Sequence, residues 1–293
     1  MTTADVKIGG VITAMATPFD ENLEVDLKAA RSLARRLAST GSDGIVVAGT
    51  TGESPTLSDE EKLSLLSAVL EEVGEELTVI CGTGSNDTRH SERLSAAAAA
   101  AGAHAVLVVT PYYNKPNREG LLAHFEAVAR AAGVPVVLYN IPGRTGVNMP
   151  PDLLEEIGAT DNVVAVKQAN DDEIGPLDGL DLLAGNDGSF LRCLRAGATG
   201  GILVASHLAG ERMKEMFDLA TAGDMEGAER IDAELTALYE ALSVTTNPIP
   251  LKHALDHLGI VGGEMRLPLV RAGAAEREAI ESALAGLGLG PSA

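Results

Sequence analysis

The segment that decides the fold is VVAVKQAN, Val163–Asn170, in which a run of valine and alanine ends in a lysine. Short apolar runs without polar alternation are typical of strands buried on both faces, as in parallel sheets. The chain contains eight runs of this kind. The other seven are GVITAMAT (10–17), DGIVVAG (43–49), LTVICGTG (77–84), HAVLVVTP (104–111), VPVVLYNIP (134–142), DLLAGND (181–187) and GGILVAS (200–206).

Amphipathic segments separate these runs, for example LKAARSLARRLAST (27–40) and EEKLSLLSAVLEEVG (60–74). Several end in a glycine shortly before the next run, which predicts a left-handed residue at the end of a helix. These glycines are Gly41, Gly74, Gly102 and Gly133. Eight strand–helix units predict the α/β class and a (β/α)8 TIM barrel. A doubly wound open sheet is the alternative.

After Ala205 the apolar runs stop and only helical patterns follow. Helices are predicted near residues 210–222, 225–243, 250–258 and 274–287. We therefore expect a catalytic barrel at residues 1–223 and a C-terminal helical region, an appendage to the barrel, at residues 224–293.

The charge of the chain narrows its possible partners. The formal net charge is −20, and acidic residues are spread along the predicted helices. Nucleic acid and acidic membrane surfaces are disfavoured as partners, because phosphate groups attract basic faces. A strongly acidic chain with only 3% aromatic residues resembles proteins of salt-loving organisms. An acidic protein of an ordinary cytoplasm is the alternative.

The cysteines and the start of the chain bear on its location. Cys81 and Cys193 have the spacing of neither a disulfide framework nor a metal site, which fits a reducing cytoplasm. The start MTTADVKIGG has no segment typical of a signal peptide. No apolar run reaches the roughly 18 residues of a membrane span. We expect a cytoplasmic protein with no membrane partner.

Chemistry is expected where the strands end, because barrel enzymes place their sites at the C-terminal ends of the strands. Lys167 ends the sixth run, and Tyr139 lies near the end of the fifth. An amine among apolar side chains loses its proton more easily and can then form a Schiff base with a ketone. Tyr139, on the adjacent strand, is close enough to carry that proton. The alternatives are a lysine that reaches solvent and a tyrosine that packs in the core.

Two loops offer groups for anions. GTTGES (49–54) presents N–H groups and hydroxyls that suit a small carboxylate, although it is not a P-loop. Arg144, after the fifth run, can hold a carboxylate in a bidentate fork. The alternatives are a tight turn and a surface arginine. His253 and His257 lie four residues apart, but HALDH lacks the glutamate of a zinc-protease helix, so no metal site is predicted.

Six motifs occur together in an order that resembles one family. They are GTTGESPTLS (49–58), VTPYYNKP (109–116), YNIPGRTG (139–146), VKQAN (166–170), AGND (184–187) and NPIPLKHALDHLGI (247–260). The chain resembles the dihydrodipicolinate synthase family, within the superfamily of class I pyruvate aldolases that includes N-acetylneuraminate lyase. The resemblance extends from Gly9 to Val270, most of the chain.

The resemblance implies a pyruvate site around Lys167, which would form the Schiff base. Tyr139 would be the general acid and base, in a hydroxyl relay with Thr50 and Tyr113. Tyr113 would reach this relay from a partner chain, across a tight dimer interface. The resemblance also implies that Thr51 binds the carboxylate of pyruvate and that the Ile202 backbone lies beside pyruvate. Gly185 would line the base of the pocket, and Arg144 would bind the carboxylate of the second substrate.

The implied activity is the condensation of pyruvate with L-aspartate 4-semialdehyde to 4-hydroxy-tetrahydrodipicolinate, a step of lysine and diaminopimelate biosynthesis. The resemblance implies no metal or organic cofactor, and a homotetramer built from two tight dimers. The alternative is a related pyruvate-dependent aldolase acting on a 2-keto-3-deoxy sugar acid, against which Arg144 counts. A non-catalytic barrel that binds a keto acid is a third hypothesis.

The chain departs from the family pattern at three positions that we expect near the pocket. Gln168 replaces the usual glutamate after the lysine, and Leu203 and His207 differ in and after the last strand. These changes bear on the choice of second substrate and not on the Schiff base.

Members of the family that are regulated by lysine carry polar and histidine residues after GTTGES and a glutamate further along. The corresponding residues here are Pro55, Asp59, Lys62 and His90. The Lys62 ammonium would repel the ammonium of the effector, so weak or absent inhibition by lysine is expected.

Overall fold

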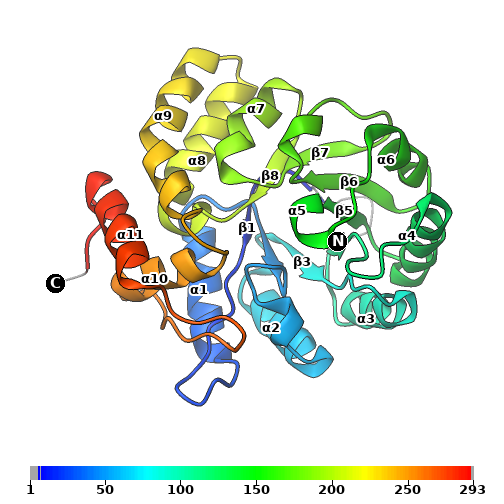
Figure 1. The fold of residues 1–293 in the computed structure, drawn as a ribbon, viewed down its shortest axis with the longest axis horizontal. Helices are drawn as coiled ribbons and strands as arrows, with labels where there is room; N and C mark the ends of the chain where they lie inside the picture. The colour runs from blue at the N-terminus through cyan, green and yellow to red at the C-terminus, as the bar shows by residue number, and fades with distance from the viewer. Residues whose placement is uncertain (1–5, 7, 292–293) are drawn as a thin grey trace.

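A computed structural model describes residue 6 and residues 8–291 of the chain. Eight parallel strands form a closed barrel in chain order (Figure 1). The barrel closes where β1 pairs with β8, for example Ile12 with Ile202. The TIM barrel prediction is therefore confirmed, and the open sheet is wrong. The strands are β1 (Gly10–Ala14), β2 (Gly44–Val47), β3 (Thr78–Gly82), β4 (Ala105–Val109), β5 (Val136–Asn140), β6 (Val163–Gln168), β7 (Asp181–Ala184) and β8 (Gly200–Leu203).

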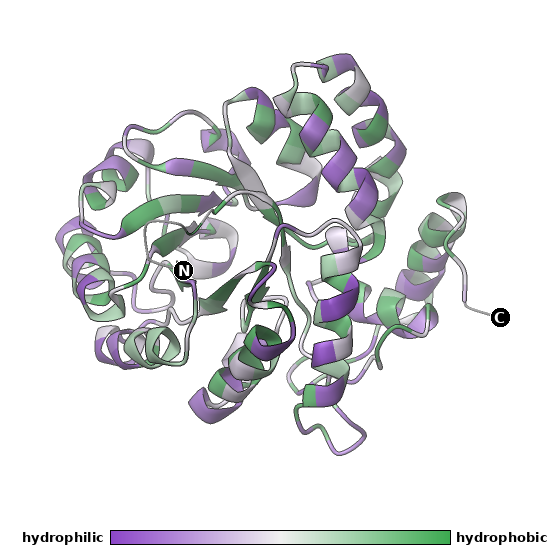
Figure 2. Ribbon diagram, turned by 180° about the vertical axis from the view of Figure 1, so that it is seen from behind, coloured by the Kyte–Doolittle hydropathy of each residue, from purple (hydrophilic) through white to green (hydrophobic). Residues whose placement is uncertain are grey.

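The two faces of each strand bury different side chains, because successive residues of a strand point in opposite directions. Inside the barrel, Ile12, Val46 and Ala165 belong to one apolar cluster. Outside it, Val166 belongs to a larger cluster between the strands and the helices. Figure 2 shows apolar stretches in the strands and mixed polar and apolar stretches in the surrounding helices.

Helices cover the outside of the barrel (Figure 1). Side-chain caps begin several of them: the Asp26 carboxylate accepts the Ala29 N–H, and Ser58 forms a capping box with Glu61. The helices of the barrel are α1 (Leu27–Ser39), α2 (Asp59–Val73), α3 (Thr88–Ala100), α4 (Arg118–Ala132), α5 (Pro142–Thr145), α6 (Pro151–Gly158), α7 (Phe190–Arg195) and α8 (Ser206–Thr221).

Three of the four predicted left-handed glycines are confirmed. Gly41, Gly102 and Gly133 have φ values of +96°, +99° and +63°. The prediction is wrong for Gly74, whose φ is −67°. After Gly74 the chain continues in a further turn before β3, in which the Glu76 and Leu77 N–H groups both donate to the Val73 carbonyl (3.0 and 2.9 Å).

The C-terminal region consists of α9 (Met225–Ala241), α10 (Ile249–His257) and α11 (Ala274–Gly286). They form a group on one side of the barrel, next to α8 and α1 (Figure 1). All four helices predicted after Ala205 are confirmed, although α8 begins earlier, at Ser206, and kinks at Ala209. The proposed boundary between residues 223 and 224 stays a prediction. Both expected regions include terminal residues that lie outside the described part of the chain.

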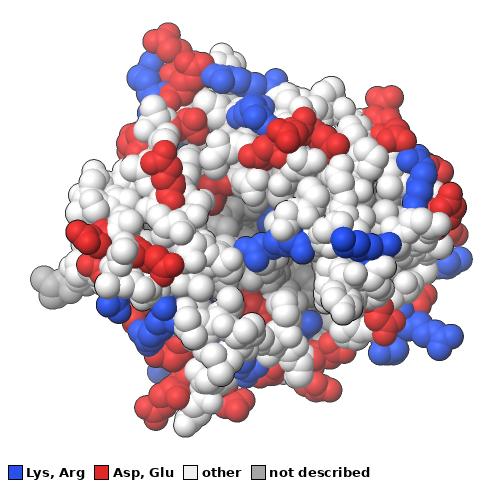
Figure 3. All heavy atoms as spheres, viewed as in Figure 1, with Lys and Arg blue, Asp and Glu red and all other residues white. Residues whose placement is uncertain are grey.

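The surface carries the acidic excess. Figure 3 shows acidic side chains over the periphery and a hollow near the centre with basic side chains at its edge. Among the described residues, no helix combines the length and apolar character needed to span a membrane. Most of the N-terminal segment in which no signal peptide was recognised lies outside the described residues.

Candidate active site

Lys167 and Tyr139 lie side by side at the C-terminal ends of β6 and β5. The two residues are partners in the parallel register, and both side chains are about 95% buried, at 5% exposure each. Tyr139 belongs to the apolar cluster inside the barrel. The Lys167 Nζ lies 4.4 Å from the centre of the Tyr139 ring. The fold therefore encloses one amine beside one phenol at the mouth of the barrel.

The surroundings of Lys167 are mainly apolar, with one carboxyl group in range. The barrel interior supplies Val137, Ala165 and Ile202. Burial raises the pKa of Asp187, whereas two backbone hydrogen bonds and the charge of Lys167 lower it. These hydrogen bonds come from the Val204 and Ala205 N–H groups, at 2.9 and 3.0 Å. The Asp187 carboxyl group therefore shares the buried surroundings of Lys167.

A cavity of about 550 Å³ opens beside Tyr139. Its wall includes three of the residues predicted from the sequence, Thr50, Tyr139 and Arg144, together with Tyr112. The structure thus brings together a phenol, a hydroxyl and a guanidinium from three different loops and strands. Lys167, Thr51, Gly185 and Ile202 are not among the lining residues.

Asn247 joins two of the predicted loops. Its Nδ2 donates to the Thr51 Oγ1 at 2.9 Å, and its carbonyl accepts from an Arg144 guanidinium nitrogen at 3.4 Å. Thr51 is 2% exposed. Asn247 is the first residue of the NPIPLKHALDHLGI motif, and the sequence predicted no role for it. Its position shows that the C-terminal region orients both the GTTGES loop and the Arg144 loop.

A buried ion pair fixes the end of the GTTGES loop. Glu53 has a left-handed backbone (φ +55°), and its carboxylate pairs with Lys252 of α10, both side chains being almost fully buried. The Lys252 Nζ also donates to the Glu264 carbonyl (2.6 Å) and lies 4.3 Å from the centre of the Phe19 ring. Glu53 Oε2 further accepts the Arg266 N–H (3.1 Å). Burial lowers the pKa of Lys252, and the charge of Glu53 opposes this shift. The sequence did not predict this ion pair, because it offers only a glutamate in one motif and a lysine in another, with nothing to connect them.

Gly185 and Ile202 form part of the packing around Lys167. A Cβ at Gly185 would lie 2.6 Å from the Gln168 carbonyl oxygen and 2.7 Å from the Ala169 Cβ, so only glycine fits beside the end of β6. The Gly185 N–H donates to the same carbonyl at 2.8 Å. Ile202 is fully buried inside the barrel. Gly185 therefore supports the strand that carries the lysine, and Ile202 fills the barrel interior.

Tyr113 does not reach the site within one chain. It is 86% exposed, with a left-handed backbone (φ +71°), and it is not among the residues that line the cavity. The neighbouring Tyr112 is 37% exposed and does line it. A relay that contains Tyr113 therefore needs a second copy of the chain.

Comparison with known proteins identifies this arrangement. A family model, that of the Dihydrodipicolinate synthetase family, matches residues 7–286. The chain belongs to this family. It is 46% identical over 280 residues to 4-hydroxy-tetrahydrodipicolinate synthase of Desulforudis audaxviator, covering 93% of this chain and 95% of the relative. It is 45% identical over 289 residues to the same enzyme of Moorella thermoacetica, covering 96% and 99%.

Solved structures of the family have the same fold. Dihydrodipicolinate synthase of Thermotoga maritima superposes with a TM-score of 0.93 at 39% identity, over 96% of this chain and 99% of that one. The enzyme of Acinetobacter baumannii, described as complexed with pyruvate, gives a TM-score of 0.94 at 36% identity, over 97% and 100%.

The three departures from the dihydrodipicolinate synthase pattern are not among the residues that line the cavity. Lys167 is not among those residues either, so the expected place of the departures near the pocket stays a prediction. Strand alternation points Lys167 inward and Gln168 outward, where its Oε1 accepts from Asn140 Nδ2 (3.1 Å) and the Asn170 N–H (3.0 Å). Leu203 likewise belongs to the outer cluster.

His207 is also a structural residue in this family member. It is 1% exposed, and its Nε2 accepts the Ala16 N–H at 3.1 Å. Burial lowers the pKa of His207 to about 4. None of the three departures lines the cavity.

The residues compared with the lysine-regulated members border the outer part of the same cavity. Asp59 of α2 pairs with His90 of α3, with Nε2 2.8 Å from Oδ1. Lys62 is 8% exposed, and burial lowers its pKa while Asp59 opposes this. Pro55 lines this part of the cavity as well. Lys62 and His90 therefore both interact with Asp59, an acidic residue of their own chain.

Proposed function

We propose that this protein is a 4-hydroxy-tetrahydrodipicolinate synthase, which condenses pyruvate with L-aspartate 4-semialdehyde through a Schiff base on Lys167. The single observation that carries this proposal is the enclosed pair of Lys167 and Tyr139, 4.4 Å apart from Nζ to ring centre, beside a cavity that Arg144 lines. An amine nucleophile, a proton carrier and a carboxylate ligand are the three groups that the reaction requires.

The first half of the reaction forms the enamine. The neutral Lys167 amine attacks the ketone carbon of pyruvate, and loss of water leaves a protonated imine. This imine draws electrons, so the pyruvate methyl group loses a proton and becomes an enamine carbon. Tyr139, with Thr50, carries the protons between the carbinolamine, the imine and solvent. The Thr51 hydroxyl and backbone bind the pyruvate carboxylate, and Asn247 holds that hydroxyl in place.

The second half joins the substrates. The enamine carbon attacks the aldehyde carbon of the semialdehyde, whose carboxylate Arg144 holds in a bidentate fork. The aldehyde oxygen takes up a proton and becomes the hydroxyl of the product. The amine of the bound chain then attacks the imine carbon and displaces Lys167, which closes the ring and frees the enzyme. The attacking amine gives up a proton and the Lys167 nitrogen takes one up as it leaves, and we assign these transfers to Tyr139 and Thr50.

We also propose the assembly and domain roles. The exposed Tyr113 supports a tight dimer in which each chain completes the relay of the other, and two such dimers would form a homotetramer. A relative that is 39% identical is described as a monomeric variant. Analytical ultracentrifugation tests the proposed assembly: a tetramer is expected, and a monomer would contradict it. Residues 1–223 would carry the chemistry, and residues 224–293 would orient its loops through Asn247 and Lys252.

The regulation and habitat that we propose follow from charge. One relative, 40% identical, is described with lysine bound. In this chain, Lys62 and the paired Asp59 and His90 support weak or absent inhibition by lysine. The net charge of −20 supports a cytoplasm rich in salt.

Borohydride reduction in the presence of pyruvate tests the proposed chemistry. A stable mass gain on the peptide that contains Lys167, absent in Lys167→Ala, is expected. Assays with pyruvate plus aspartate semialdehyde, and with pyruvate plus glyceraldehyde, then separate the synthase from the sugar-acid aldolase. A parent protein that gains no mass would be a keto-acid binder, and the proposal would be wrong.

A further inference from the structure

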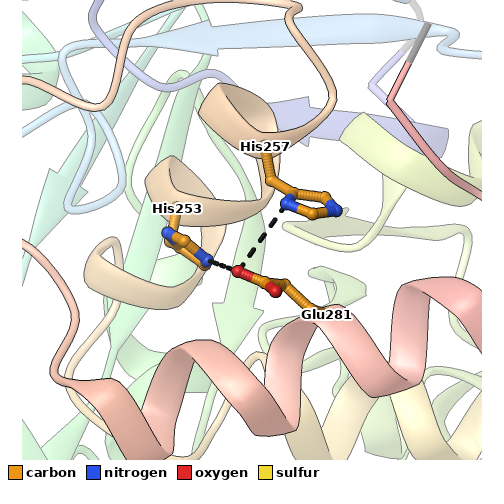
Figure 4. A group of neighbouring side chains, drawn as sticks. All are labelled: His253, His257 and Glu281. Atoms are coloured by element: carbon orange, nitrogen blue, oxygen red, sulfur yellow. Dashed lines mark hydrogen bonds and ion pairs between the residues drawn. The ribbon is translucent and has the colours of Figure 1, made fainter. Parts of the chain in front are cut away.

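Three potential metal ligands meet between α10 and α11, on the C-terminal region. His253 and His257 lie one turn apart on the same face of α10, and Glu281 of α11 points between them (Figure 4). One carboxylate oxygen, Glu281 Oε1, lies 2.9 Å from His253 Nε2 and 3.6 Å from His257 Nδ1. One ligand atom from each residue falls within a group whose members are all within 4.8 Å of one another.

We propose that His253, His257 and Glu281 form a binding site for a divalent transition metal, with Zn²⁺ as the ion that fits best. Two imidazoles and one carboxylate are an established donor set for zinc, which leaves a fourth position for water. Bonds of about 2.0–2.1 Å in a tetrahedron place ligand atoms about 3.4 Å apart. The two distances to Glu281 lie on either side of that value, and all three ligand atoms lie within 4.8 Å of one another. Side-chain rotations that bring the two histidine nitrogens to the same spacing would admit the ion.

An ion pair alone accounts less well for this cluster. A single carboxylate needs one protonated imidazole for a charge pair, whereas here two imidazoles converge on the same oxygen atom. Asp256, between the two histidines in the sequence, pairs instead with Arg271 at 2.8 Å and leaves the group. Nitrogen donors favour Zn²⁺ over Mg²⁺ and Ca²⁺, which prefer sites made of oxygen.

The site is open to solvent and separate from the catalytic mouth. The side chains of His253, His257 and Glu281 are 16%, 25% and 42% exposed, so an ion and its water can enter. Lys252, which precedes His253, points the other way, into the buried pair with Glu53. A bound ion would therefore tie α11 to α10, the helix that holds the GTTGES loop. Its role is structural, and it is independent of the proposed activity.

Titration of the full-length protein with Zn²⁺ tests this inference. The protein is first freed of metal with a chelator and desalted, and binding is measured by competition with a chromophoric zinc indicator. One site per chain is expected, together with a higher melting temperature when Zn²⁺ is present. Loss of an outer-shell partner alone weakens a metal site about 10–100-fold, so His257→Gln and Glu281→Gln should each weaken binding by about 100-fold or more.

Matched controls separate the site from general attraction to an acidic surface. Glu278→Gln removes an exposed carboxylate from the same helix and should leave zinc affinity and the melting shift unchanged. Imidazole signals of His253 and His257 in NMR spectra should move with one equivalent of Zn²⁺ and not with Mg²⁺. Equal affinity in the parent, His257→Gln and Glu281→Gln would overturn the proposal, and so would equal affinity for Mg²⁺. Pyruvate trapping on Lys167 reports on the proposed function separately, and should not change when zinc is removed.

Discussion

Replacing Lys252 with methionine should damage both the stability and the catalytic loop of this protein. The exposed fractions of Lys252 and Glu53 are 0% and 1%, so water cannot compensate the Glu53 carboxylate when its partner is removed. Breaking a buried pair from one side costs about 3–5 kcal/mol. Methionine has a similar length and fills the space, so a cavity adds little to this figure. The free energy of unfolding should therefore fall by about 3–5 kcal/mol in urea titrations followed by circular dichroism.

The same substitution should also weaken pyruvate binding, because Glu53 ends the loop that carries Thr50 and Thr51. We expect KM for pyruvate to rise more than kcat falls in Lys252→Met. Lys28→Met, on the exposed side of α1, is the matched control and should change neither quantity. The double variant Lys252→Met/Glu53→Gln removes both charges and keeps an acceptor for the Arg266 N–H, so it should be more stable than Lys252→Met. A loss below about 1 kcal/mol in Lys252→Met, or a double variant that is less stable than either single one, would refute the reasoning.

Four further predictions concern the site, the pH response, regulation and salt. Arg144→Ala should leave pyruvate trapping intact. It should lower the rate of condensation with aspartate semialdehyde by about 100-fold or more, because the paired hydrogen bonds between the guanidinium and the substrate carboxylate are lost. A rate like that of the parent would contradict the substrate assignment. The pKa of His207 is lowered to about 4, so between about pH 6.5 and 4 the unfolded chain binds a proton at this residue and the folded chain does not. The free energy of unfolding should therefore fall as the pH drops through this window, by up to about 3 kcal/mol from His207. His207→Gln should flatten this dependence on pH. Lysine at submillimolar concentration should leave the initial rate near its uninhibited value, and half-inhibition there would contradict the role given to Lys62. Molar KCl should raise the melting temperature, because ions screen the repulsion within a chain of net charge −20, whereas a lower melting temperature would contradict a salt-rich habitat.

Much of the site was predictable because strand order and direction are. Parallel strands in a barrel bring their C-terminal ends to one mouth, so Lys167 and Tyr139 had to meet there once their strands were recognised. Gln168 shows the limit of nearness in sequence. It adjoins the lysine in the chain, yet strand alternation places its side chain on the outer face of the barrel, in an amide network with Asn140.

Other contacts left no signal that local patterns could reveal. Asn247 and Thr51 are 196 positions apart, and Lys252 and Glu53 are slightly farther apart. His253 and His257 were visible as a pair, but their third partner, Glu281, belongs to another helix. Which face of α10 meets the catalytic loop, and which meets α11, depends on how the C-terminal helices pack against the barrel.

The sequence by itself determined the barrel, its C-terminal helices, the enclosed lysine and the family. These properties follow from apolar runs, helix periodicity and motifs, which act over a few residues at a time. Only the tertiary structure decided that Gln168 joins an amide network with Asn140, that Glu53 is held by a buried lysine, and that a carboxylate joins two histidines. Each of these depends on the distance between side chains that are remote in the chain, and that distance is set only when the helices and strands have packed.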